Sequence, residues 1–158
     1  MLPAAACPTC PTLLVDIAGD ASTCPSCGAP MVPGHGPDGD AAEHVAYELA
    51  LGPRAAIVGL RGQLDLAAAP AVEAALARAL AQEPHVVLVD LTAVEFADST
   101  ALSLLLGAAR RLGSGRALIT IAPPADARLV FRVAGLEDFL GMRDSRRAAM
   151  AALHRAAR

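Results

Sequence analysis

The stretch "VVLVDLTAVEFADSTALSLLLGAARRLG" (residues 86–113) decides the fold class. It begins with a continuous apolar run, which is typical of a strand buried on both faces. From Ser99 onward an apolar helical face is expected at Leu102, Leu105, Leu106, Ala109 and Leu112, and Gly113 is placed to end that helix. A buried strand that leads directly into an amphipathic helix predicts an α/β domain, in which helices connect neighbouring strands.

The sequence on either side of this stretch continues the alternation of strands and helices. Gly52-Pro53 separates the first two strands, which predicts a hairpin, and Pro70 stands in a first helical turn, where its missing N–H is tolerated. The pattern predicts strands over residues 44–51, 55–62 and 116–122, and helices over residues 70–82, 125–135 and 145–158. The expected fold is therefore a mixed β-sheet with packed helices.

Composition and charge exclude several classes of function. With 54% hydrophobic and 18% charged residues, the 158-residue chain can bury a core. Aromatic residues are only 3%, and residues 1–53 contain no Lys or Arg, so we expect no nucleic-acid partner. No apolar run is long enough to span a bilayer, and the first residues do not resemble a signal peptide, so we expect a cytoplasmic protein without a membrane partner.

Three segments differ in composition. Residues 1–29 contain all four cysteines, residues 30–42 are rich in proline and glycine, and residues 43–158 carry the periodic pattern. These segments predict a small head, a flexible linker and one α/β domain.

The cysteines form two C-x-x-C pairs, Cys7 with Cys10 and Cys24 with Cys27. This array resembles a zinc ribbon, although its middle spacer is slightly short. Four thiolates would complete a tetrahedral site, so the expected zinc is structural; a redox dithiol and an iron site are the alternatives. The residues between the pairs can form a hairpin with Gly19-Asp20 as its turn.

The polar sequence Asp98-Ser99-Thr100 allows two interpretations. These side chains can cap the N-terminus of the helix, where backbone N–H groups lack partners. A hydroxyl at the positive end of a helix is also a favourable place for a phosphate group. The two roles can coexist.

Three blocks in order resemble the STAS domain of bacterial anti-sigma factor antagonists (anti-anti-sigma factors) over roughly residues 44–157. They are "GQLDLAAAPAVEAAL", "VDLTAVEFADSTALSLLLGAARRLG" and "RVAGLEDFL". The resemblance implies a STAS-like α/β fold behind a zinc-ribbon-like head. It also implies that Ser99 is the phosphoacceptor, with Asp98 and Asp65 forming an acidic rim around it. The implied partner is an anti-sigma factor that is also a serine kinase and binds only the unphosphorylated form.

This sequence departs from the family pattern after Ser99. Thr100 replaces a serine and is a second candidate acceptor, and Ala101 replaces a glycine, which removes backbone freedom. We expect Asp65, Asp98, Thr100 and Leu104 to contact the partner. Ala101, Leu104 and Ala108 lie off the main apolar face of the helix, so they form either an exposed docking patch or a surface covered by neighbouring loops.

Two further functions remain open at this stage. One is a STAS scaffold that is never phosphorylated and assembles a signalling complex. The other is a thiol or zinc redox sensor coupled to the STAS domain. No phosphate-binding glycine loop, catalytic histidine or pair of catalytic carboxylates stands out, so the sequence predicts a non-enzymatic regulator.

Overall fold

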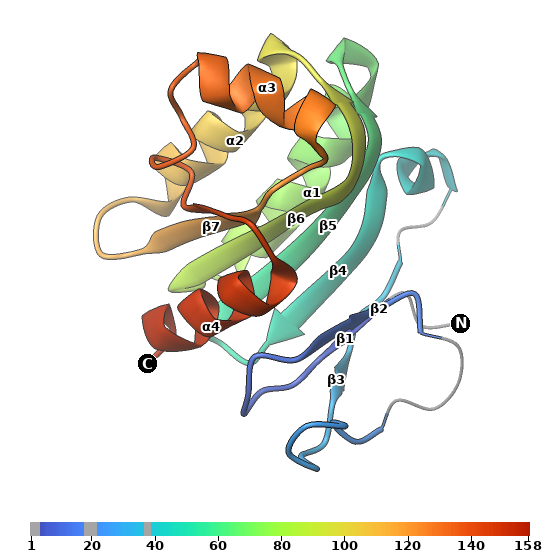
Figure 1. Ribbon diagram of the computed structural model, residues 1–158, viewed down its shortest axis with the longest axis vertical. Coiled ribbons are helices and arrows are strands. Elements are labelled where there is room, and N and C mark those ends of the chain that lie inside the picture. Colours follow the sequence, from blue (N-terminus) through green and yellow to red (C-terminus); the bar gives the residue numbers. More distant parts are fainter. Residues whose placement is uncertain (1–3, 18–21, 37–38) are drawn as a thin grey trace.

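The computed structural model describes residues 4–17, 22–36 and 39–158 (Figure 1). A five-stranded sheet forms the centre, with the strand order β4-β5-β6-β7-β8. Its strands are β4 (Val45–Leu51), β5 (Ala55–Leu64), β6 (Val86–Ala97), β7 (Ala117–Ile121) and β8 (Met142–Arg143). The helices are α1 (Ala69–Ala81), α2 (Ser99–Leu112), α3 (Ala125–Val133) and α4 (Arg146–Ala156), with short 3-10 turns η1 (Gly39–Glu43) and η2 (Leu66–Ala68).

The topology confirms the predicted mixed α/β fold. β4 and β5 form the expected antiparallel hairpin, while β5, β6, β7 and β8 run parallel in sequence order. The helices α1, α2 and α3 are the connections between these parallel strands. The predicted α2 is confirmed from Ser99 to Leu112, with Gly113 at its C-cap in a positive-φ conformation.

Two features of the sheet differ from the prediction. β6 continues to Ala97, well beyond the apolar run that ends at Leu91, because its last residues still pair with β5, through register shifts that break the simple alternation of buried and exposed positions. β8 was not predicted, since two residues are too short for any periodic signal.

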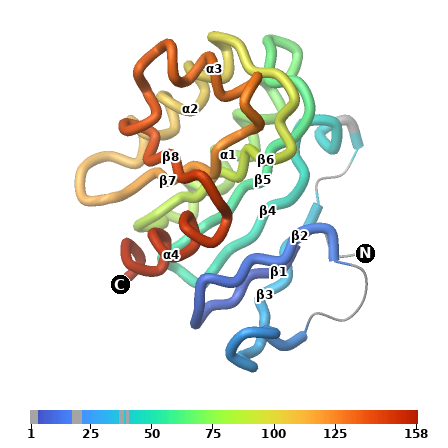
Figure 2. The backbone as a smooth tube through the Cα atoms, in the orientation of Figure 1, coloured from blue at the N-terminus to red at the C-terminus, as the bar shows by residue number. Residues whose placement is uncertain are grey.

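The sheet has different coverings on its two faces (Figures 1 and 2). On one face, α1, α2 and α3 bury a cluster that includes Val58, Val89, Leu105 and Phe131. On the other face, α4 and the N-terminal head cover a second cluster. The domain is therefore a three-layer structure in which the head supplies part of one layer.

The head is a three-stranded antiparallel sheet of β1 (Ala4–Ala6), β2 (Leu13–Val15) and β3 (Val32–Pro33), in the order β2-β1-β3. β2 pairs with β1, so the Cys7–Cys10 segment occupies the loop of this hairpin. The proposed turn at Gly19-Asp20 lies outside the described residues.

The expectation of a flexible linker over residues 30–42 is wrong for much of its described part. β3 is a strand of the head sheet, and His35 pairs with Glu48 of β4 through two backbone hydrogen bonds of 2.8 and 2.9 Å. Proline and glycine content suggested flexibility, but these backbone groups find partners in β1 and β4.

A buried polar cluster joins the sheet to α4. Tyr47, Gly59 and Asp90 occupy paired positions on three adjacent strands, and the Tyr47 hydroxyl donates to Asp90 Oδ2 at 2.6 Å. A Cβ atom on Gly59 would lie 2.2 Å from the Tyr47 ring, so the absence of a side chain lets the ring cross β5. Arg146 at the start of α4 donates to the same Asp90 oxygen at 3.3 Å and to Thr92.

Candidate functional site

Asp98 connects β6 to α2 and caps the helix. It has an extended backbone (φ −122°, ψ −164°), and its Oδ1 accepts from the Thr100 N–H at 2.8 Å. This confirms the capping interpretation of the Asp98 side chain.

Asp65 has the same arrangement at the end of the neighbouring strand. Its backbone is also extended (φ −114°, ψ −169°), and its Oδ1 accepts from the Ala68 N–H at 3.2 Å. Leu64 and Ala97 are paired in the parallel register of β5 and β6, so the two aspartates that follow them emerge side by side. The structure thus brings together two acids that are 33 positions apart in the sequence.

Ser99 and Thr100 form the first residues of α2. Ser99 is exposed and Thr100 is half-buried. The Thr100 N–H, one of the free donors expected at a helix N-terminus, is already bonded to Asp98. Ser99 is therefore the more accessible hydroxyl, in a setting with two nearby carboxylates.

For Ala101, Leu104 and Ala108, the sequence left open an exposed docking patch or a covered surface, and the structure shows coverage for two of the three. Ala101 and Ala108 are buried, at 0% and 3% exposure, and belong with Leu105 and Leu112 to the face that packs on the core. The sequence assigned the apolar face to Leu102, Leu105 and Leu106, but small alanines are favoured where α1 lies close to α2. Neighbouring elements cover this surface, which was the alternative interpretation.

Leu104 is the third residue of that patch and is half-buried. It lines a hollow of about 120 Å³ between α1 and α2, together with Glu73, Ser103 and Arg111. It lies one helical turn beyond Thr100 on the same side of α2, and the hollow that it lines faces α1. Its contact with a partner stays a prediction.

Sequence analysis missed several exposed apolar side chains, two of which lie beside Asp65 and Asp98 where β5 and β6 end. Leu66 follows Asp65 and is 78% exposed, and Phe96 precedes Ala97 at 48% exposure. Between α2 and α3, Leu102, Leu129 and Val133 line an open hollow of about 450 Å³ that Ala97 and Asp126 also border. The available signal was Phe96 itself, a large apolar residue that follows the exposed Glu95 after the continuous apolar run of β6 has ended.

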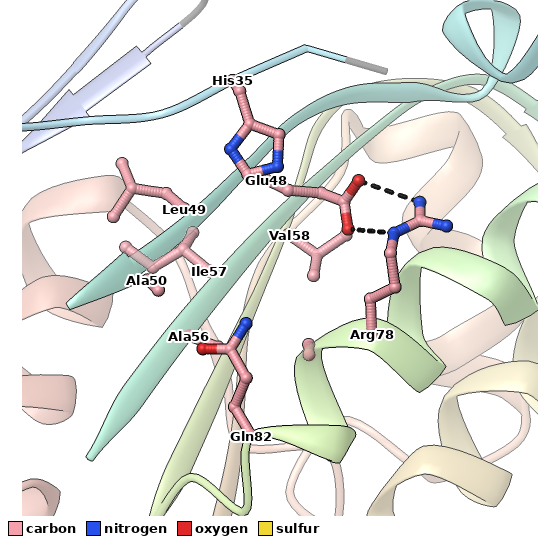
Figure 3. A pocket seen from close by; sticks show the side chains of 10 residues that line it. His35, Glu48, Leu49, Ala50, Ala56, Ile57, Val58, Arg78 and Gln82 are labelled. Carbon is pink, nitrogen blue, oxygen red and sulfur yellow. Dashed lines mark hydrogen bonds and ion pairs between the residues drawn. The ribbon is translucent and has the colours of Figure 1, made fainter. Parts of the chain in front are cut away.

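A third hollow, of about 90 Å³, lies between β4 and α1 (Figure 3). Arg78 of α1 donates from Nε and Nη2 to the two carboxylate oxygens of Glu48, both at 2.9 Å. The pKa of Arg78 is raised, mainly by its hydrogen bonds to Glu48. This bidentate pair holds α1 against the edge strand, and the hollow is too small for more than a few atoms.

The four cysteines converge as the spacing predicts. Their sulfur atoms all lie within 4.8 Å of one another, with Cys7 to Cys27 and Cys10 to Cys24 each at 3.5 Å. Zn–S bonds of about 2.3 Å place tetrahedral sulfurs about 3.8 Å apart, so the cluster has nearly the dimensions of a four-cysteine zinc site. All four cysteines are free thiols.

Backbone N–H groups point at these sulfurs. Thr9 and Cys10 donate to Cys7 Sγ at 3.3 and 3.4 Å, and Ser26 donates to Cys24 Sγ at 3.4 Å. Burial raises the pKa of Cys24, but the donors, led by the Ser26 N–H, outweigh it and lower the pKa to about 6. Such donors stabilise thiolates, which are the form that binds a metal.

A five-stranded mixed sheet with an acid-flanked serine at the start of α2 defines the class of protein. Residues 47–149 match the STAS domain family, so the chain belongs to the STAS domain family. No helix within the described part of the chain combines the length and the hydropathy needed to cross a membrane.

Among individual proteins, the chain is similar to the anti-sigma-F factor antagonist RsfB of Mycobacterium tuberculosis, from strains CDC 1551 / Oshkosh and ATCC 25618 / H37Rv. They are 29% identical over 82 residues, which cover 52% of this chain and 67% of RsfB. The structure of an anti-sigma factor antagonist from Mycobacterium paratuberculosis superimposes with a TM-score of 0.60 at 23% identity, covering 83% of this chain and 97% of that one. The unphosphorylated form of the anti-sigma factor antagonist SpoIIAA gives a TM-score of 0.49 at 21% identity, over 62% and 86% of the two chains.

Proposed function

We propose that this protein is an anti-sigma factor antagonist that acts by partner switching under the control of Ser99 phosphorylation. The observation that carries the proposal is the exposed Ser99, which follows the helix cap Asp98, with Asp65 at the end of the adjacent strand. The similarity to RsfB supports the general role. The partner would be an anti-sigma factor with serine kinase activity in the cytoplasm, and this chain would need no catalytic activity of its own.

The local charges explain how a phosphate would act as a switch. A phosphate on Ser99 would add a charge of about −2 next to two carboxylates. The helix dipole favours an anion there, but the Thr100 N–H already bonds Asp98 and is not free to hold it. The phosphate would therefore project into solvent, where it blocks a docked partner by repulsion and by the cost of desolvation.

The surface around Ser99 suits a partner that presents basic and apolar groups. Asp65, Asp98 and Asp126 supply negative charge, while Leu66 and Val133 are each 78% exposed. We propose that Thr100 lies in this contact surface and that Leu104 marks its far boundary along α2. Surfaces with an apolar centre and a charged rim are typical of protein–protein interfaces.

We also propose that Cys7, Cys10, Cys24 and Cys27 bind one structural zinc ion. Sulfur spacing and N–H donation to the sulfurs support this assignment. Four thiolates complete the tetrahedron and leave no open coordination position, so the ion would have no catalytic role.

Phosphopeptide mass spectrometry on the protein isolated from its own cells, in growth and under stress, tests the switch. We expect phosphate on Ser99 that changes with condition. Pull-downs with Ser99→Ala and Ser99→Asp should then give opposite results, with the Ala variant retaining the anti-sigma factor. Ser114→Ala, on the exposed turn after α2, is the control, because it removes a hydroxyl at the opposite end of the helix and should leave both results unchanged.

One structural observation favours a second candidate, a STAS scaffold that is not phosphorylated. Ala101 is completely buried and fixes the first turn of α2, which opposes unwinding of Ser99 into a kinase active site. If Ser99 carries no phosphate in any condition while the protein still captures a partner, the scaffold replaces the switch. Faster phosphorylation of Ala101→Gly by the captured kinase would identify this turn as the restraint.

A further inference from the structure

We infer that metal binding by the four cysteines and docking of the head on the STAS sheet are a single coupled equilibrium, in which one zinc ion keeps β1, β2 and β3 on the sheet face beside α4. This inference rests on the zinc site proposed above and is independent of partner switching: absence of bound zinc would refute the site, whereas bound zinc without coupled protection would refute the coupling alone. Three connections between the metal site and the body carry the argument.

The first connection is β1, which has one face in each cluster. Ala4 and Ala6 are 0% exposed and pack in the cluster of Tyr47 and Leu49 on the main sheet. Ala5 points the other way, into a cluster with the metal-site residue Cys7. Side chains alternate along a strand, so the register of β1 fixes both sets of contacts. If β1 shifts or is released, its contacts with the main sheet and its contacts with the cysteine cluster are lost together.

The second connection joins the first cysteine pair to α4. His154 Nε2 donates to the backbone carbonyl of Cys10 at 3.0 Å. Cys10 is one of the four sulfur ligands, so the loop that wraps the ion is tied directly to the last helix. Nearby Pro8 of the same loop lines a hollow with Leu153 and Arg54 of the body.

The third connection continues from the second cysteine pair through β3 to the sheet edge. The Gly34 N–H donates to the Ala4 carbonyl at 2.8 Å, and His35 exchanges both backbone hydrogen bonds with Glu48. A Cβ atom at Gly34 would lie 3.1 Å from the Glu48 carbonyl and 3.3 Å from that of Ala4, so the backbone passes tightly between the head and the body.

Without metal the head has little to hold it together. Its own cluster consists of the buried residues Ala5, Cys7, Cys24 and Met31, with a few half-buried neighbours. Two of these four buried residues, Cys7 and Cys24, are proposed metal ligands. Segments of this size generally fold only with a metal or a disulfide, and binding free energy is then folding free energy. Removal of the ion should therefore release the head and uncover the apolar side chains around Leu49.

Hydrogen exchange on the full chain, with zinc bound and after chelation under reducing conditions, tests the coupling. We expect one zinc per chain when loaded. Chelation should speed amide exchange at least tenfold in the head, in β4 (Val45–Leu51) and in the last turns of α4, but not in α2. If faster exchange is confined to residues 4–33, or if no zinc binds, the inference is wrong. Readdition of zinc must restore protection, which separates release from irreversible unfolding.

A body variant gives the reciprocal test, since coupling acts equally in both directions. His154→Ala removes the bond to the Cys10 carbonyl without touching a sulfur. We expect the stoichiometry to remain one and the zinc affinity, measured by competition with a chromogenic chelator, to fall about fivefold, the worth of one neutral hydrogen bond. Ser114→Ala, on the exposed turn after α2, is the matched control. Equal affinities for His154→Ala and the unaltered chain would refute coupling through α4.

Discussion

Raising the pH above 10 should destabilise this protein because the Tyr47 hydroxyl keeps its proton in the folded state and loses it on unfolding. This hydroxyl is buried on the sheet and donates to Asp90 Oδ2 at 2.6 Å. Burial, followed by the negative charge of Asp90 and the hydrogen bond to it, raises the pKa of Tyr47 far above its ordinary value of 10.0. Folded molecules should therefore keep the phenolic proton at pH values where unfolded molecules have released it.

The size of the effect follows from this difference in proton binding. Because the folded-state pKa is the raised one, the stabilisation is complete below pH 10 and is lost as the pH rises. Between the unfolded and the folded pKa, the free energy of unfolding should fall by about 1.4 kcal/mol for each pH unit. Two units would remove about 2.7 kcal/mol, a large share of the roughly 5–15 kcal/mol typical of a domain.

The composition makes the assay unusually clean. The chain has one tyrosine and no tryptophan, and all 13 of its Lys and Arg residues are arginines, which do not titrate below pH 12. Urea denaturation at pH 9, 10, 11 and 11.5, with zinc present, would give the slope. Absorbance at 295 nm would report tyrosinate from Tyr47 alone and should rise only as the protein unfolds.

Tyr47→Phe is the control, because it keeps the ring and removes the ionisable group. Its stability should be lower at pH 8 by about 1.5 kcal/mol but should not show the alkaline slope. A smooth tyrosinate titration with a midpoint near pH 10, while the circular dichroism of the fold stays constant, would show that the hydroxyl is hydrated and would refute the reasoning.

Three other predictions concern stability and can be measured by thermal and urea unfolding. Gly59→Ala should lower the free energy of unfolding by about 2–4 kcal/mol, because the new methyl group displaces the Tyr47 ring. Gly107→Ala, whose new methyl group meets no atom within 4 Å, should raise it by about 0.5–1 kcal/mol, because alanine is favoured over glycine inside a helix. Equal effects of the two changes would contradict the packing around Gly59. Asp98→Ala should lower the free energy of unfolding by about 1 kcal/mol, because α2 loses its N-cap, while Asp98→Asn keeps a capping oxygen and should be nearly neutral. Similar losses of stability in both variants would assign the effect to the charge of Asp98. Gly141→Ala should lower the free energy of unfolding by about 1–3 kcal/mol. Gly141 has a positive φ, and a Cβ atom there would lie 2.5 Å from the Leu118 carbonyl oxygen of β7. An unchanged unfolding midpoint would refute this.

The parts of the fold that sequence predicted well are those with strong local signals. α2 was predicted at both ends because Asp98 and Gly113 have the residue types that begin and end helices. The convergence of the cysteines was predicted by the two C-x-x-C spacings alone. The adjacency of Asp65 and Asp98 came only from the family resemblance, and the parallel register of β5 and β6 explains it physically.

The remaining features depend on contacts that no local pattern encodes. The buried face of α2 was misassigned because leucines dominate the hydropathy of that helix, while close packing of α1 on α2 selects Ala101 and Ala108. The order of residues 32–35 was missed because proline and glycine were read as a linker, although their backbone groups pair with β1 and β4. Tertiary hydrogen bonding overrides composition in such segments.

The backbone pairing of His35 with Glu48 also affects how the molecule resists self-association. β4 is one edge of the main sheet, and an exposed edge strand can recruit a strand from another molecule. His35 occupies the middle of that edge, and the opposite edge, β8, has only two residues. A version of the chain that begins at residue 43 would keep the STAS domain and the Ser99 region but leave seven residues of β4 open to strand addition. We therefore expect such a shortened chain to self-associate more readily than the full chain.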